Sequence, residues 1–99
     1  MQVFDVETFA QDEKIAFALD MVARKPSGGS VSSATGTITN PTGDRAALSA
    51  TPSVSGDVVT ATVTGGTDVV ATGYHYLDLL VTLSNGEKPR YRVPLNVTV

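Results

Sequence analysis

Hydrophobic and polar residues alternate along most of the chain from about residue 30 onward. Strict alternation is typical of a β-strand that buries one face. The pattern predicts strands at residues 30–39, 57–64, 73–83 and 89–99. Stretches rich in Gly, Pro and Asn lie between them, such as NPTGD at 40–44, and these favour turns. We expect an all-β protein, an antiparallel β-sandwich of about six or seven short strands that ends in a C-terminal hairpin.

The segment at residues 12–25, DEKIAFALDMVARK, fits two structures. Its large hydrophobic residues alternate with small or polar ones, as in a half-buried strand, whereas its Ala, Leu, Met, Lys and Arg residues favour a helix. Ile15, Leu19 and Val22 would share one face of such a helix. We favour a strand, because the predicted sheet needs a partner of this length. The stretch KPSGGS at residues 25–30 is expected to be a flexible loop.

The turn at Ser84-Asn85-Gly86 decides which face of the last hairpin is buried, because strand side chains alternate with period two. A two-residue type I′ turn would place the hydrophobic stripe of the first strand opposite charged residues. A three-residue loop, with Gly86 in the left-handed region as a bulge, gives one continuous hydrophobic face instead. We therefore predict these pairs: Val81 with Pro89, Leu79 with Tyr91, Leu77 with Val93, His75 with Leu95, and Asp78 with Arg92.

The residues that catalysis or cofactor binding requires are nearly absent. The chain contains no Cys, which excludes a disulfide framework, a thiolate metal site and a cysteine nucleophile. The one imidazole, His75, lies at an inward position of a predicted strand, where we expect a packed residue rather than a general base. No phosphate-binding, dinucleotide-binding or hydrolase motif occurs. We therefore expect no enzymatic activity, no catalytic residue and no cofactor.

The charge distribution argues against nucleic acid, membrane and metal as partners. The formal net charge is −3, and the seven Lys and Arg residues are scattered rather than gathered into a phosphate-binding stripe. The longest hydrophobic run is far shorter than the roughly 20 residues that a membrane span needs. Acidic residues gather near the N-terminus without the spacing of a calcium-binding loop. We expect them to form an exposed acidic arm without a metal: Asp5, Glu7, Asp12 and Glu13.

Residues 1–12 are expected to form an N-terminal arm ahead of a single domain at residues 13–99, since a chain of this length holds one core. The arm lacks the basic and apolar regions of a signal peptide, so we expect the protein to be made in the cytosol and either kept or assembled into something there. Phe4 and Phe9 lie outside the predicted strands. The arm that carries them is either folded back on its own core or docked on another chain. The Ser- and Thr-rich strand faces are either solvated or contact surfaces for neighbouring subunits.

Several motifs occur in an order that resembles a known family. Lys14–Asp20 fits a strand of the type K-I-x-F-x-L-D, Gly65-Gly66-Thr67 precedes a strand led by Tyr74, and residues 81–86 form a V-T-x-S-x-G corner. Over residues 13–99 the chain resembles small Ig-like structural proteins of tailed bacteriophages. Within them it is most similar to fiber-tail adaptor proteins and related head-tail or baseplate proteins.

The resemblance implies an Ig-like sandwich that serves as a virion component without catalysis and is made in the host cytoplasm. Its partners would be copies of itself, in a homo-oligomer, and neighbouring tail, fiber or head-tail proteins. The alternative is an Ig- or fibronectin-like binding module for carbohydrate or a cell surface, in which Tyr74 or Tyr76 would stack on the ligand. The candidate interface residues are Phe4, Phe9, Tyr74 and Tyr76.

Overall fold

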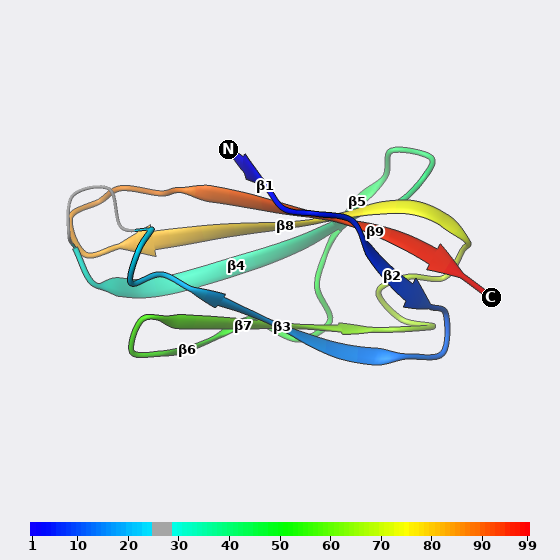
Figure 1. Cartoon of the computed structure of the whole chain (residues 1–99), viewed down its shortest axis with the longest axis horizontal. Coiled ribbons are helices and arrows are strands. Elements are labelled where there is room, and N and C mark those ends of the chain that lie inside the picture. The colour runs from blue at the N-terminus through cyan, green and yellow to red at the C-terminus, as the bar shows by residue number, and fades with distance from the viewer. Residues whose placement is uncertain (25–28) are drawn as a thin grey trace.

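Every regular element that the structure describes is a β-strand. The computed structural model describes residues 1–24 and 29–99, and Figure 1 shows its strands in two layers. The larger sheet has the order β1-β9-β8-β4-β5, with β2 also paired to β9, and the smaller sheet has the order β3-β7-β6. The strands are β1 (Gln2–Val3), β2 (Glu7–Ala10), β3 (Lys14–Asp20), β4 (Val31–Thr39), β5 (Arg45–Ala47), β6 (Ser53–Ser55), β7 (Val58–Thr64), β8 (Gly73–Leu83) and β9 (Arg90–Thr98). The expected all-β sandwich is confirmed.

Within the segment at residues 12–25, the structure has a strand and not a helix, as we favoured. Its residues Lys14–Asp20 form β3 and pair antiparallel with β7 along their whole length. The burial pattern of β3 alternates between exposed positions and more buried ones, which is the period-two behaviour of a strand. The flexible loop expected at residues 25–30 falls largely on residues 25–28, which lie outside the described residues.

The sheet topology is that of an Ig-like sandwich. In such domains strands B, E and D are neighbours in one sheet, and strands C, F and G form the other, with C′ added beside C in the variable type. Here β3-β7-β6 has the order B-E-D, and β5-β4-β8-β9 has the order C′-C-F-G. The two sheets therefore have the connectivity that the resemblance implies.

Two details of the predicted sandwich are corrected. The described residues contain nine strands rather than six or seven, because β1, β2, β5 and β6 span only two to four residues each. Segments this short show no periodicity that sequence reasoning could detect. In addition, β1 and β2 run parallel to β9, so the sandwich is not antiparallel throughout.

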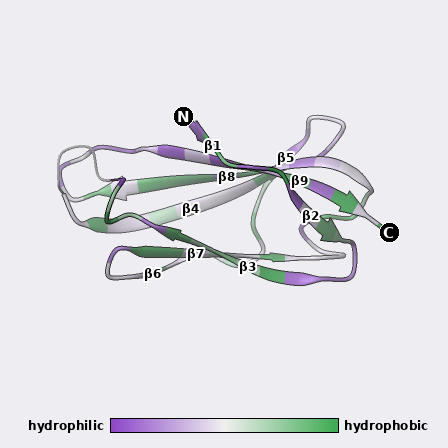
Figure 2. Cartoon of the chain, viewed as in Figure 1, coloured by the Kyte–Doolittle hydropathy of each residue, from purple (hydrophilic) through white to green (hydrophobic). Residues whose placement is uncertain are grey.

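Hydrophobic residues recur along the strands of both sheets (Figure 2), and those that the alternation predicts to face inward are buried in one core. In β7 the three small hydrophobic residues at odd positions are buried, and the Thr residues between them are partly exposed on the other face. Burying a Leu or Val side chain stabilises the fold by about 1.5–3 kcal/mol, so the shared interior holds the two sheets together. Its largest fully buried members are Phe9, Met21, Leu77, Leu79, Leu83, Leu95, His75, Val59, Val63, Val69, Val81 and Val97.

The last hairpin has the predicted bulged register. Val81 N–H donates to Pro89 O at 3.0 Å, so these two residues face each other as expected. Gly86 has a φ of +89°, and its N–H donates to Leu83 O at 3.0 Å. This is a type I turn closed by a left-handed glycine. The ladder confirms the remaining pairs: Leu79 with Tyr91, Leu77 with Val93, His75 with Leu95, and Asp78 with Arg92.

The N-terminal arm folds back on its own domain and forms an edge of the larger sheet. β1 pairs with the start of β9, and β2 pairs with its end. The ladder is interrupted between them, where Phe4 N–H donates to Arg92 O at 2.8 Å. The next bond of a parallel ladder would come from residue 94, which is proline and has no N–H. Pro94 therefore explains why the arm leaves β9 and rejoins it.

Phe9 is a core residue, which corrects its expected role at an interface. Its side chain is fully buried, and β2 places it in register with Val97 of β9. An aromatic side chain contributes a large apolar surface to a core that has few of them. Of the two possibilities for the arm, the structure shows the one in which it is folded back on its own core.

The chain passes from the larger sheet to the smaller one at a tight corner, residues 11–13. Gln11 N–H donates to Thr98 O at 2.9 Å, and Gly65 N–H donates to Glu13 O at 2.7 Å. A Cβ atom on Gly65 would collide with the backbone oxygen of Gln11 and would lie 2.6 Å from Glu13 O. Only glycine fits at residue 65, because these backbone atoms pass so close to it.

Candidate functional site

The outer face of the larger sheet carries an aromatic and basic cluster. Tyr74 and Tyr76 project from β8 and are 54% and 37% exposed. Arg92 on β9 lies over the ring of Tyr76, with Cζ 4.6 Å from the ring centroid, a cation–π geometry. Arg45 and Arg90 border a hollow on the same face. We call these residues the tyrosine–arginine face: Tyr74, Tyr76, Arg45, Arg90 and Arg92.

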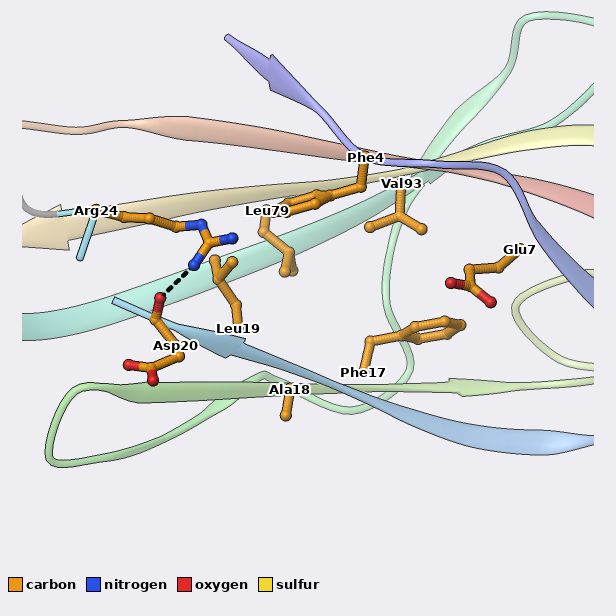
Figure 3. Close-up of a pocket in the computed structure, with 9 residues that line it drawn as sticks. All are labelled: Phe4, Glu7, Phe17, Ala18, Leu19, Asp20, Arg24, Leu79 and Val93. Carbon is orange, nitrogen blue, oxygen red and sulfur yellow. Dashed lines mark hydrogen bonds between the residues drawn. The ribbon is translucent and has the colours of Figure 1, made fainter. Parts of the chain in front are cut away.

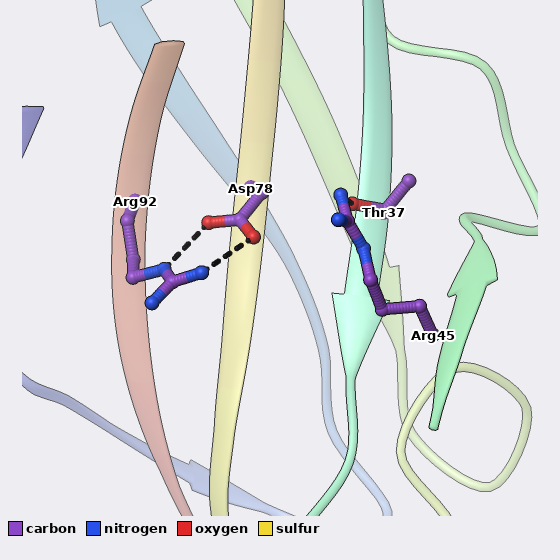
Figure 4. A network of polar contacts seen from close by, with 4 residues as sticks. All are labelled: Thr37, Arg45, Asp78 and Arg92. Carbon is purple, nitrogen blue, oxygen red and sulfur yellow. Dashed lines mark hydrogen bonds and ion pairs between the residues drawn. The ribbon is translucent and has the colours of Figure 1, made fainter. Parts of the chain in front are cut away.

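Asp78 anchors this face through Arg92 (Figure 4). Its side chain is only 3% exposed, and its two carboxylate oxygens accept hydrogen bonds from Nε and Nη2 of Arg92 at 2.8 and 3.0 Å. The hydrogen bond with Asp78 raises the pKa of Arg92 above its ordinary value, and the charge of Asp78 adds to the effect. A bidentate pair fixes the orientation of the guanidinium. Arg92 is therefore a rigid, permanently charged element of the surface.

A shallow hollow of about 160 Å³ lies beside the Asp78–Arg92 pair. Arg45 Nη2 donates to Thr37 Oγ1 at 3.1 Å, which ties the side chain from β5 to β4 (Figure 4). Because Arg92 already balances the charge of Asp78, Arg45 and Arg90 leave the hollow with an excess of positive charge. Such a hollow suits a carboxylate of a partner protein. It is lined by Thr35, Thr37, Arg45, Asp78, Leu80 and Arg90.

A second hollow, the side groove, lies between the arm and β3 and has a volume of about 340 Å³ (Figure 3). The arm is at an edge of the larger sheet and β3 is at an edge of the smaller one, so the groove opens where the sandwich is not closed by a further strand. Most of its walls are hydrophobic. It is lined by Phe4, Glu7, Phe17, Ala18, Leu19, Asp20, Arg24, Leu79 and Val93.

Phe4 forms part of the wall of the side groove. Its ring stacks on Tyr91 with a centroid distance of 6.1 Å, and Cζ of Arg24 lies 5.3 Å from the centroid of the Phe4 ring. Arg24 is held in turn by a hydrogen bond from Nη1 to Asp20 O at 2.8 Å. Burial raises the pKa of Tyr91, and the charge of Arg24 offsets part of that rise. Phe4, expected at an interface, is thus half-buried and lines the groove.

His75 lies in the interior, as expected for a packed residue. It is fully buried, and Nδ1 lies 3.2 Å from Gly73 O. Within the part of the chain that the structure describes, Nε2 has no hydrogen-bond partner. A general base needs access to substrate and to the proton it abstracts, whereas the side chain of His75 is fully buried among the residues that the structure describes.

The acidic residues near the N-terminus are not gathered into one cluster in the structure. Among residues 1–24 and 29–99, no three His, Asp or Glu side chains are grouped so that they could hold a metal ion. Glu13 has a structural contact instead, because its Oε1 accepts the N–H of Ala10 at 2.7 Å across the corner. In the same ranges, no helix is long and apolar enough to cross a membrane.

The structure separates the four residues that the sequence put forward for an interface. Tyr74 and Tyr76 lie on the outer face of the larger sheet, Phe4 lines the side groove, and Phe9 is in the core. Arg45 and Arg90 were not predicted from the sequence as members of the outer face. Arg90 could have been predicted from the hairpin register, because it lies two residues from Arg92 on β9 and side chains two residues apart share a face. Arg45 lies on a strand of three residues, which is too short to predict.

No family model matches the sequence of this chain, and no curated protein matches it.

Proposed function

We propose that this protein is a non-enzymatic structural component of a tailed bacteriophage virion, an adaptor or connector in the tail, fiber or head-tail region. It acts by assembling with copies of itself and with neighbouring virion proteins. The proposal rests on the motifs that resemble small Ig-like phage structural proteins and on one observation, the tyrosine–arginine face. Tyr and Arg, together with Trp, are the residue types that are enriched among those that dominate the binding energy of protein interfaces.

The chemistry of the tyrosine–arginine face supports a protein partner with acidic groups. Arg45, Arg90 and Arg92 are three of the seven Lys and Arg residues in an acidic chain. A basic patch on an acidic molecule attracts the acidic surface of a partner and favours one orientation of the complex. The same attraction favours a head-to-tail arrangement with a second copy. The fixed guanidinium of Arg92 lowers the conformational cost of binding, because it is already oriented.

A carbohydrate-binding module is the second candidate, and the exposure of Tyr74 favours it. A sugar ring stacks on the open face of an aromatic side chain, and Tyr74 is 54% exposed. The ring of Tyr76 is less suited to this role, because the guanidinium of Arg92 lies over it at 4.6 Å. A glycan array that shows selective binding, lost in Tyr74→Ala, would replace our proposal with this one.

The protein content of purified particles tests the virion proposal. We expect mass spectrometry to find this chain in particles of the phage or prophage that encodes it. Deleting the gene should yield particles that lack the attached tail or fiber. Arg90→Glu should reduce incorporation of a folded chain, whereas Ser55→Glu on β6 of the other sheet should not. Complete, infective particles that do not contain the chain would overturn the proposal.

A further inference from the structure

One edge of β3 faces no other strand in the part of the chain that the structure describes. Gly65 N–H donates to Glu13 O and Met21 N–H donates to Asp57 O, both at 2.7 Å. These two bonds set the alternation of the antiparallel ladder, so the odd-numbered residues of β3 bond to β7. The backbone N–H and C=O groups of its even-numbered residues therefore point away from the sheet. Such a row of unpaired groups is a template for another strand.

The middle of this edge lacks the features that usually protect a strand from pairing. Ala16 and Ala18 are small, uncharged and exposed, and the register of β3 with β7 is uninterrupted by a bulge. Proline, inward-pointing charge and bulges are the ordinary protections, and β3 has none of them. β3 is also long for an edge, with seven residues against three in each of β5 and β6.

β3 is self-complementary in one antiparallel register. The outward-pointing backbone N–H and C=O groups of the even-numbered residues must bond to the same groups of a second copy. In this register Ala16 lies opposite Ala18 of the second copy, and the twofold axis passes through Phe17. The same register places Lys14 opposite Asp20 of the second copy at both ends of the strand. A shift by two residues in either direction separates both of these charge pairs. Opposite charges that face each other across strands contribute roughly 0.2–1 kcal/mol per pair, so this register is preferred.

We propose that two copies of this chain pair antiparallel along β3 and form one continuous sheet with the order β6-β7-β3-β3-β7-β6. The two Phe17 side chains meet at the twofold axis on the inner face. Phe17 is half-buried in the single chain and lines the side groove (Figure 3). Pairing therefore removes part of the hydrophobic wall of the groove from water, which favours association.

Arg24 limits the paired segment to the middle of the strand. Its Nη1 already donates to Asp20 O at 2.8 Å, so the carbonyl of Asp20 has a partner. The unpaired backbone groups of Ala16 and Ala18 remain for the second copy, and they form reciprocal bonds. An interface of one strand is smaller than the 1,200–2,000 Å² of a standard interface. We expect weak association of the isolated protein, with a Kd on the order of 10 µM to 1 mM.

Proline substitution tests the edge directly. In Ala16→Pro the lost N–H is one that points away from β7, so the fold should be kept while the pairing is blocked. Val54→Pro is the matched control, because Val54 lies on β6 at the opposite edge of the same sheet and its N–H also points outward. Sedimentation between about 10 µM and 1 mM should show dimers for the parent chain and for Val54→Pro, and monomers for Ala16→Pro. A parent chain that is monomeric throughout, or an Ala16→Pro chain that dimerises like the parent, would overturn the proposal.

Cysteine cross-linking tests the register, because the chain contains no other Cys. A mixture of Ala16→Cys and Ala18→Cys chains brings the two thiols to directly opposite positions, within the range of a disulfide. Either variant alone places its thiols on the longer diagonal. We expect mild oxidation to give at least about tenfold more cross-linked dimer from the mixture than from either variant alone. Equal cross-linking in all three samples would overturn the proposed register.

This inference deepens the proposed function by naming a second copy and β3 as the first contact in assembly. The two proposals fail in different experiments. A chain that pairs along β3 but is absent from particles would overturn only the virion proposal. A chain that enters particles equally well as Ala16→Pro and shows no dimer in solution would overturn only the β3 pairing.

Discussion

Asp78 and Arg92 face each other across β8 and β9, joined by two hydrogen bonds of 2.8 and 3.0 Å between a carboxylate that is 3% exposed and a guanidinium side chain that is 31% exposed. The pair lies on the outer face of the sheet, away from the hydrophobic core. Burying the carboxylate of Asp78 without a partner would be costly in free energy. Arg92 neutralises this charge, and Asp78 in turn holds Arg92 in a fixed position on the tyrosine–arginine face.

Removing the carboxylate of Asp78 should destabilise the domain. Asp78→Ala leaves the guanidinium of Arg92 without its partner, and hydrogen bonds to charged groups contribute about 1.5–3 kcal/mol. We expect the free energy of unfolding in urea to fall by that amount. The double variant Asp78→Ala/Arg92→Ala should lose less than the sum of the single variants, since the two residues act as a unit. Strict additivity in this cycle would argue that the pair contributes nothing.

The hairpin turn predicts unequal costs at adjacent residues. Gly86→Ala should lower the free energy of unfolding by about 1–2 kcal/mol, because Gly86 has a φ of +89° and a Cβ is unfavourable there. Asn85→Ala should cost less, because Asn85 has no positive φ and its hydrogen bonds with Glu87 are exposed. Urea denaturation of both variants measures the difference. Equal costs would contradict the bulged turn.

The corner between the sheets should be intolerant of a single added carbon. Gly65→Ala forces a Cβ against backbone oxygens of the corner, among them Glu13 O at 2.6 Å, and we expect a loss of about 2 kcal/mol or more. Gly66→Ala is the control, because its Cβ would meet open space and only its φ of +79° is unfavourable. Thermal unfolding should therefore rank Gly65→Ala as the less stable variant. The reverse order would show that the corner can relax.

Alkaline pH should weaken the fold through Tyr91. Burial raises the pKa of this phenol above its ordinary value of 10.0, more than Arg24 lowers it. Above pH 10 the unfolded chain loses the proton while the folded chain keeps it, so the free energy of unfolding falls as pH rises. The stabilisation of the fold by the protonated phenol of Tyr91 is complete below pH 10 and is lost as pH rises through the raised pKa. Tyr91→Phe should flatten this part of a stability profile measured from pH 8 to 11.5. An unchanged slope would contradict the assignment to Tyr91.

Periodicity and turn chemistry were sufficient to predict the long strands and the register of the last hairpin. Alternation over seven or more residues identified β3, β4, β7, β8 and β9, and the requirement for one continuous hydrophobic face selected the bulge at Gly86. These features depend on local sequence, which is why they could be predicted.

The arm and the candidate surfaces depend on contacts that local sequence does not encode. β2 is a strand because β9 offers it a parallel partner, and Phe9 reaches the core only through that pairing. Arg45 joins the outer face because β5 turns back on β4. The side groove exists because β1 and β2 pair with β9 instead of β3. These pairings depend on contacts between segments that are distant in the sequence, so local patterns do not predict them.

The parallel course of the arm and β9 has a mechanical consequence. Because β1 and β2 run in the same direction as β9, a force that pulls the N-terminus and the C-terminus apart acts along these strands in opposite senses. The hydrogen bonds between them are then loaded together in shear and are not broken one after another. We expect pulling experiments through the two termini to give a higher unfolding force than pulling across β3 and β6. The pairing of the arm with β9 should therefore resist tension that is applied through the two termini.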